Sequence, residues 1–225
     1  MTIGRPGHVV AAAPGDRAVE RTAVTAVRPA RQVHDVLRAA PRNAVALTID
    51  DGPDPLWTPQ ILDLLHRTGV RATFSLIGVQ AHACPGLVKR ILAEGHGVAN
   101  HSMTHPQPFG RGNAATIRKQ ITDAQSAITD AGGVAPTLFR APGGDWSAAV
   151  LSAVQDLQLV PVGWDIDPRD WSRPGTALVT GRLLAARAGD ILLCHDGGGN
   201  RAQTLESLHT VLPVLKGRGL QFVTL

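Results

Sequence analysis

Short apolar runs that alternate with longer segments of helical period constrain the fold of this chain more than any other feature. The alternation begins at residue 44 and continues to the end of the sequence. It is typical of a parallel α/β sheet, in which each strand is followed by a helix. The predicted strands cover residues 44–49, 70–77, 96–100, 137–141, 160–164, 189–195 and 220–225. Seven strands with six intervening helices predict a distorted, incomplete α/β barrel of the TIM-barrel type.

The chain is predicted to form one domain after a short leader. Its 225 residues are 44% hydrophobic and 18% charged, which is enough for a substantial core. Residues 1–40 are rich in Ala, Arg, Pro and Gly and lack sustained periodicity, so we expect a flexible basic leader with a short helix around residues 32–38. The folded domain is then expected over residues 41–225.

Charge and composition exclude several classes of protein. The net charge of +4 lies mostly in residues 1–40, which hold six arginines against three acidic residues. No run of Lys and Arg interleaved with aromatic residues appears, so a nucleic-acid partner is not expected. Two cysteines, Cys84 and Cys194, do not indicate a disulfide framework. No apolar run approaches the roughly 20 residues of a membrane span, and no secretory signal is recognisable at the N-terminus.

A pair of adjacent carboxylates follows the first predicted strand. The run 44–49 is almost wholly apolar, and Asp50, Asp51, Gly52 and Pro53 come directly after it. Neighbouring carboxylates repel each other, and each loses hydration on burial, so such a pair needs a cation or an arginine beside it. The pair therefore indicates a site of chemistry.

Other polar clusters follow strands in the same way. His101 and His105 follow the third strand, Arg140 ends the fourth, Asp167 and Asp170 follow the fifth, and His195 with Asp196 ends the sixth. In parallel α/β folds, the loops at the carboxyl ends of the strands converge on a ligand. We therefore expect these residues to meet in one pocket, although they are far apart in the sequence.

Two histidines and one carboxylate make up a common catalytic zinc set. His101 and His105 are four residues apart, and on a helical turn both rings would project toward one metal. Asp51 is the predicted third ligand. Such a set accepts zinc, cobalt or a similar divalent ion, and zinc is our preferred prediction.

Hydrolysis at such a metal also requires a base and an acid. Asp50 is the predicted base, and Arg140 would pair with it and keep it ionised. His195 is the predicted acid, and Asp167 is the predicted carboxylate that holds its imidazole. Gly143, in the turn after Arg140, could offer a backbone N–H to an oxyanion. Taken singly, His195 could equally be a core histidine and Asp167 a turn residue before Pro168.

Tryptophans lie close to these clusters in the sequence. Trp146, Trp164 and Trp171 could stack on the apolar face of a sugar ring, or they could simply pack in the core.

The polar clusters, in this order, resemble the five motifs of the polysaccharide deacetylase family, also called the NodB-homology domain or carbohydrate esterase family four. The resemblance rests on residues 48–53, 101–105, 140–144, 167–171 and 193–195 and covers about residues 41–225. It implies a barrel of about seven strands and metal-dependent removal of acetyl groups from N-acetylated sugars, or from O-acetylated xylan in some members. It also implies the same base, acid and metal ligands as above, with Trp171 and Leu193 lining the acetyl pocket.

The sequence departs from the family pattern at two positions. Ile49 replaces the usual Phe, and Gly143 stands where the family usually has Tyr or Phe, so one wall of the groove is missing. Trp146 could replace that wall, or the groove could be wider.

Two alternatives to a glycan deacetylase follow. One keeps the same catalytic residues and metal ligands but has a small acetylated or cyclic amide as its substrate. The other is a non-catalytic glycan-binding protein, which should have lost Asp50 or His195. The resemblance implies an extracellular or cell-envelope location, with the cytoplasm as the alternative, and the oligomeric state is not predicted.

Overall fold

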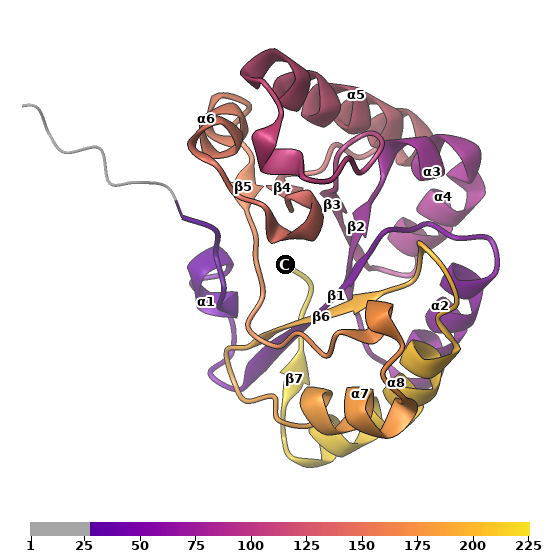
Figure 1. Cartoon of the computed structure of the whole chain (residues 1–225). Coiled ribbons are helices and arrows are strands. Elements are labelled where there is room, and N and C mark those ends of the chain that lie inside the picture. Colours follow the sequence, from indigo (N-terminus) through magenta and orange to yellow (C-terminus); the bar gives the residue numbers. More distant parts are fainter. Residues whose placement is uncertain (1–27) are drawn as a thin grey trace, which may run out of the picture.

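The computed structural model of the chain describes residues 28–225, which form a curled parallel sheet surrounded by helices (Figure 1). The strands are β1 (Ala44–Asp50), β2 (Thr73–Leu76), β3 (Gly97–Asn100), β4 (Leu138–Phe139), β5 (Val160–Pro161), β6 (Ile191–His195) and β7 (Gln221–Phe222). Every pairing between these strands is parallel. The prediction of an incomplete α/β barrel is therefore confirmed.

The sheet order places β1 between β2 and β6. Neighbouring strands follow in the order β5, β4, β3, β2, β1, β6, and β7 pairs with the first residues of β1. Asp50, at the end of β1, is in register with Ser75 on one side and His195 on the other. At the opposite end of the sheet, the N–H of Leu225 donates to Thr73 Oγ1 at 2.9 Å. The end of β1 thus lies directly beside the end of β6.

Eight α-helices accompany these strands in the described part of the chain. They are α1 (Val33–Val36), α2 (Trp57–Thr68), α3 (Gly78–Ala83), α4 (Pro85–Ala93), α5 (Ala114–Gly132), α6 (Ala148–Asp156), α7 (Thr176–Leu183) and α8 (Ala202–Gly217). The six periodic segments of the sequence correspond to α2 and α4–α8. Helix α5 begins where Asn113 Oδ1 accepts the N–H of Thr116 at 2.8 Å, and it ends at Gly133 with φ +78°. Helix α3 was not predicted, because six residues are too few to show a period.

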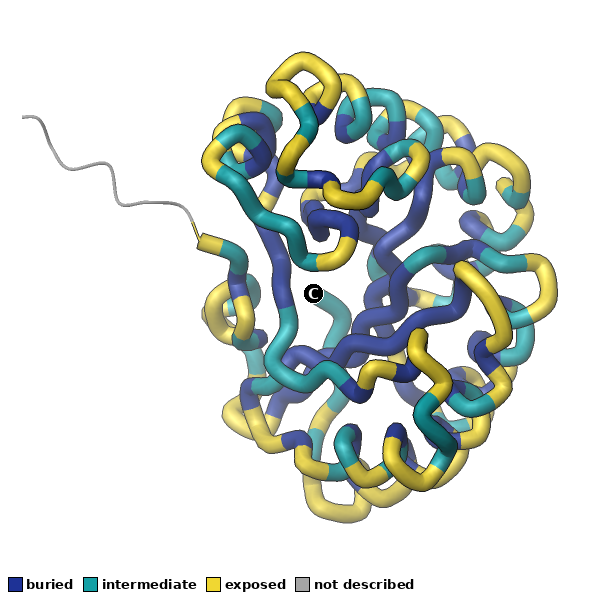
Figure 2. The backbone as a smooth tube through the Cα atoms, in the orientation of Figure 1, coloured by how far each residue is buried: buried dark blue, intermediate teal, exposed yellow. Residues whose placement is uncertain are grey.

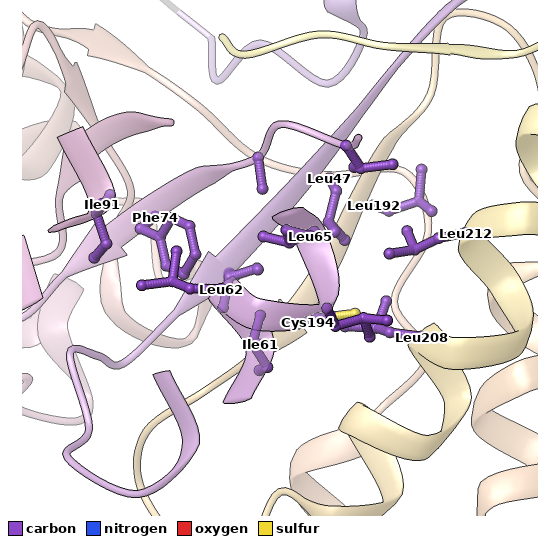
Figure 3. Close-up of a cluster of buried hydrophobic side chains, with 14 of the residues drawn as sticks. Leu47, Ile61, Leu62, Leu65, Phe74, Ile91, Leu192, Cys194, Leu208 and Leu212 are labelled. Carbon is purple, nitrogen blue, oxygen red and sulfur yellow. The ribbon is translucent and has the colours of Figure 1, made fainter. Parts of the chain in front are cut away.

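The main core lies between the sheet and the helices. Strands at the centre are buried while the outer faces of the helices are exposed (Figure 2). Figure 3 shows Leu47 and Leu192 from neighbouring strands together with Leu62 and Leu65 from α2 and Leu212 from α8. Because β1 is buried along all seven residues, it reads as a continuous apolar run in the sequence.

Irregular backbone joins the two edges of the sheet. Ala30 lies parallel to Val162 beside β5, and Gln32 pairs antiparallel with Asp190 beside β6. The N–H of Ala30 donates to Pro161 O at 2.8 Å. Ile166 also pairs with Leu192 of β6. The barrel is incomplete because these bridges, and not a further strand, close it.

The prediction of a flexible leader over residues 1–40 is wrong for residues 28–40, while residues 1–27 lie outside the described part of the chain. Val33 is fully buried in a cluster with Ala46 and Ile191, and Ala30 is 8% exposed. The predicted short helix is α1. Two isolated apolar residues produce no periodic pattern, so the predicted start of the domain at residue 41 was too late.

No helix in the described residues is long and apolar enough to cross a membrane. Neither Cys84 nor Cys194 forms a disulfide.

Candidate active site

The carboxyl ends of the strands surround one pocket of about 540 Å³. Its lining contains the predicted residues Asp50, Asp51, His101, His105, Gly143, Asp167, Trp171, Leu193 and His195. The structure thus brings these distant residues together, whereas Asp170 and Asp196, which were also expected in the pocket, are not part of its lining. Arg140 lies behind this lining and reaches it through Asp50.

Asp50 is held by a buried arginine. Arg140 Nη1 donates to Asp50 Oδ1 at 2.8 Å and to Thr48 Oγ1 at 2.7 Å. The other donors of Arg140 reach the carbonyls of Val162 and Gly163. Arg140 is 1% exposed and Asp50 2% exposed. Because every arm of the guanidinium is satisfied, Arg140 fixes the direction of the Asp50 carboxylate.

Asp51, His101 and His105 form a cluster that fits a divalent metal ion. Their ligand atoms all lie within 4.8 Å of one another. Asp51 Oδ1 is 3.5 Å from His101 Nε2 and 3.3 Å from His105 Nε2, and it is a buried oxygen with no hydrogen-bond partner in the described residues. An orphaned carboxylate oxygen between two imidazoles is what a cation would satisfy.

His101 is oriented by a backbone carbonyl. Its Nδ1 lies 2.8 Å from Arg140 O, which accepts the Nδ1 proton and leaves the Nε2 lone pair directed at Asp51. Metal-binding histidines are commonly oriented in this way. The residue that holds Asp50 thus also orients a metal-binding histidine, so the base and the metal site are coupled through Arg140.

The two histidines do not lie on a helical turn, which corrects the predicted local structure. Residues 101–105 form an irregular loop in which Ser102 has φ +67° and His105 has φ +54°. Asn100 Oδ1 accepts the N–H of Ser102 at 2.9 Å, and Ser102 Oγ accepts the N–H of His105 at 3.1 Å. These side-chain contacts support left-handed backbone that a helix could not contain. The rings nevertheless approach to 4.8 Å between centroids.

The charges of the cluster shift its proton equilibria. Burial would raise the pKa of Asp51, but the imidazole of His101 beside it and the charges of His195 and His105 outweigh burial and hold this pKa well below its usual range. Burial would lower the pKa of His101, yet the charges of Asp50 and Asp51 raise it. Burial and the charge of His101 lower the pKa of His105, which favours the neutral form that binds a metal.

The carboxylate beside His195 is Asp170, and the prediction of Asp167 for this position is wrong. His195 Nδ1 lies 2.7 Å from Asp170 Oδ1, and the backbone N–H of His195 donates to Asp170 Oδ2 at 2.9 Å. Thr204 Oγ1 donates to the same oxygen. Asp167 instead accepts the N–H of Arg169 at 2.7 Å in a turn and lines the pocket.

The backbone conformation between Asp167 and Asp170 explains why Asp170, and not Asp167, contacts His195. Arg169 has φ +56° and starts a short 3₁₀ turn, Asp170–Ser172, which directs the Asp170 side chain inward. Asp170 is 1% exposed. The sequence offered two acids after the same strand, and only the turn between them decides which one faces His195.

The Asp170 contact changes the acidity of His195. Burial would lower the pKa of His195, but the hydrogen bond and charge of Asp170 outweigh it and raise this pKa to about 9. The imidazole is therefore protonated at neutral pH, as a general acid requires.

Replacing Asp170 by Asn should lower the pKa of His195, because the amide removes the charge that favours imidazolium while burial still opposes it. We expect the alkaline limb of the kcat/KM profile, where the protonated acid is lost, to move to lower pH in Asp170→Asn. Asp167→Asn is the matched control, and its alkaline limb should stay in place. The assignment fails if the limb moves in the Asp167 variant and not in the Asp170 variant.

Asp196 is a further buried residue whose position the sequence did not explain. Its N–H donates to Asp50 O at 3.0 Å, and Thr58 Oγ1 donates to its carboxylate at 2.5 Å. A Cβ on Gly52 would lie 2.3 Å from Asp196 Oδ1, so only glycine fits in this turn. Burial raises the pKa of Asp196 to about 7. Asp196 therefore packs against the turn that follows the Asp50–Asp51 pair.

The pocket walls extend into a second pocket. Trp171 is 46% exposed at the rim, and Leu193 is buried at the base. Trp146 does not line the catalytic pocket. It lines an adjoining pocket of about 440 Å³ that shares Gly143 and Trp164 with the first. A Cβ on Gly143 would meet only Gln107, at 3.5 Å, so the missing side chain leaves open space between the two pockets.

Comparison with known proteins shows that the chain is similar to carbohydrate deacetylases. The family model described as polysaccharide deacetylase matches residues 38–162. The chain is 42% identical over 202 residues to a chitooligosaccharide deacetylase from Sinorhizobium fredii, covering 82% of this chain and 94% of that protein. It is 40% identical over 183 residues to a peptidoglycan-N-acetylglucosamine deacetylase from Bacillus cereus, covering 80% and 85%.

A solved structure shows the same fold. The crystal structure of a peptidoglycan N-acetylglucosamine deacetylase in complex with 4-naphthalen-1-yl-N-oxidanyl-benzamide superimposes with a TM-score of 0.79 at 35% identity, covering 82% of this chain and 86% of that one. The chain is thus an enzyme of the hydrolase class. It belongs to the polysaccharide deacetylase family, the NodB-homology domain.

Proposed function

We propose that this protein removes acetyl groups from N-acetylated carbohydrate in a metal-dependent hydrolysis, with Asp50 as base and His195 as acid. One observation carries the proposal. A carboxylate fixed by a buried arginine, an Asp-His-His cluster and an imidazole held by a second carboxylate all line the same pocket.

The residues of the chain divide the work of the reaction. A divalent metal held by Asp51, His101 and His105, most simply zinc, would supply the Lewis acid that activates water and polarises the acetyl carbonyl. Asp50 Oδ2, the oxygen not bonded to Arg140 Nη1, accepts the proton of the attacking water. His195 Nε2 then gives a proton to the leaving nitrogen, while Asp170 keeps its imidazole charged. A backbone N–H near Gly143 would add a donor to the developing oxyanion.

The walls of the site support a glycan substrate. Trp171 and Leu193 line the catalytic pocket, where they would flank the acetyl group, and Trp146 and Trp164 line the adjoining pocket. Two connected pockets suit neighbouring sugars of one chain, with the indoles stacking on apolar sugar faces. The relatives named above act on chitooligosaccharide and on peptidoglycan N-acetylglucosamine. We therefore propose an N-acetylglucosamine-containing glycan, and a site of action in the cell envelope.

Acetate release from chelator-stripped protein tests the proposal. We expect N-acetylglucosamine oligomers to be deacetylated only after zinc or cobalt is returned, and kcat/KM to rise with oligomer length because the adjoining pocket is filled. Acetylated xylan serves as the ester comparison. Activity that does not change with length would favour the small-amide alternative, whose basis is the open space at Gly143. Binding of oligomers without acetate release from any of these substrates would favour the non-catalytic alternative.

A further inference from the structure

Arg201 is a buried cation in the wall of the catalytic pocket that the proposed mechanism does not use. It stands directly before α8 and is 3% exposed. Its Nε donates to Gly197 O at 2.7 Å. Among residues 28–225, its two terminal nitrogens have no hydrogen-bond partner and no carboxylate forms an ion pair with it. These nitrogens are not among the fully buried unpartnered atoms of that part of the chain, so solvent in the pocket reaches them.

The loop beside Arg201 leaves its guanidinium open to the pocket. Gly198 and Gly199 have φ +72° and +141°, which side chains rarely adopt. A Cβ on Gly198 would lie 3.2 Å from Arg201 Nη2 and also 3.2 Å from Asp51 Oδ2. Arg201 Nη2 and Asp51 Oδ2 therefore flank the same side-chain-free position, so free donors of Arg201 lie close to the metal cluster.

The terminal nitrogens of Arg201 are available to a group that enters the pocket. The contact with Gly197 O uses one of five N–H donors. Arg140, the other buried arginine of the site, has an acceptor for each of its nitrogens. By contrast, Arg201 presents a positive charge and free N–H donors to the pocket, where an anionic group of a ligand could bind.

We propose that Arg201 binds a carboxylate carried by the substrate glycan next to the sugar that is deacetylated. The planar fork of arginine matches a carboxylate with two parallel hydrogen bonds. Sugars that carry an acidic ether, such as the lactyl group of N-acetylmuramic acid, present this chemistry, whereas chitin oligomers are neutral. The inference rests on the proposed function and narrows its substrate to a carboxylate-bearing glycan.

The test compares three oligomers of equal length. They are a neutral N-acetylglucosamine oligomer, an alternating N-acetylglucosamine and N-acetylmuramic acid oligomer with free carboxylates, and the same oligomer with its carboxylates amidated. Wild-type kcat/KM should be highest for the free acid. Arg201→Met should lower kcat/KM for the free acid by about tenfold or more, the size expected of a charged hydrogen bond, and change the other two by less than about twofold. Arg201→Lys should lie between, and Arg118→Met, on the exposed face of α5, should match the wild type.

Three outcomes are decisive. An equal fall in the kcat/KM of Arg201→Met on all three oligomers would overturn the proposal. Arg201 would then have a structural role in holding the glycine loop. If Arg201→Met does not fold, equal wild-type kcat/KM for the free and amidated oligomers also overturns it. If the wild type releases no acetate at all, the proposed function fails. The role of Arg201 in binding a carboxylate is then tested separately, by calorimetric binding of the N-deacetylated oligomers. Tighter wild-type binding of the free acid that Arg201→Lys weakens would support the role of Arg201, and equal binding would contradict it.

Discussion

Asp50→Asn is expected to reduce kcat for acetate release by about 10²- to 10⁴-fold, the usual contribution of a general base, while the protein still binds its metal. The amide oxygen can accept the Arg140 hydrogen bond, so the geometry around Asp50 is retained. The amide has no basic oxygen to take a proton from water. Loss of turnover without loss of metal is therefore the signature of this variant.

Asp51→Asn is the matched control, because it makes the same chemical change at the next residue. Asp51, and not Asp50, belongs to the candidate metal cluster. We expect this variant to lose metal and activity together. Metal content by atomic spectroscopy, measured beside the initial rate, separates the two behaviours. Comparable turnover by Asp50→Asn and the wild type would remove Asp50 from the role of base.

His101→Ala is expected to abolish detectable activity by removing the metal. His101 contributes its Nε2 to the cluster and is fixed through Nδ1 by Arg140 O, so it is the most constrained ligand. Metal that binds only the folded state stabilises a protein by about 4 kcal/mol at a thousand times the dissociation constant. The wild type should therefore melt at a lower temperature after chelation, whereas His101→Ala should melt at the same temperature with or without chelator.

His82→Ala provides the comparison for this experiment, since His82 is an exposed histidine on α3 outside the cluster. It should keep wild-type metal content and the wild-type response to chelator. Because alanine leaves the Arg140 carbonyl without its partner, His101→Gln is a second variant that retains a donor near that position. Full metal occupancy in either His101 variant would remove this residue from the ligand set.

The sequence predicted the site well where a residue's position depends on strand order alone. Asp50, Asp51, Arg140 and His195 end or follow strands, and parallel strands present these ends at one edge of the sheet. The prediction from the sequence was wrong where the conformation of a loop determines the position of a residue. Residues His101–His105 include left-handed backbone and do not form a helical turn, and Val33, which was predicted to be part of a flexible leader, packs against the barrel.

The sequence by itself determined the element order, the parallel sheet and the residue types that gather at its carboxyl edge, because apolar periodicity records burial. Only the tertiary structure decided which of those side chains meet. Asp167 and Asp170 are equivalent in the pattern, and the left-handed turn at Arg169 directs Asp170 to His195. Arg201 gave no signal in the sequence, because free donors that face a pocket are visible only when the surrounding residues are in place.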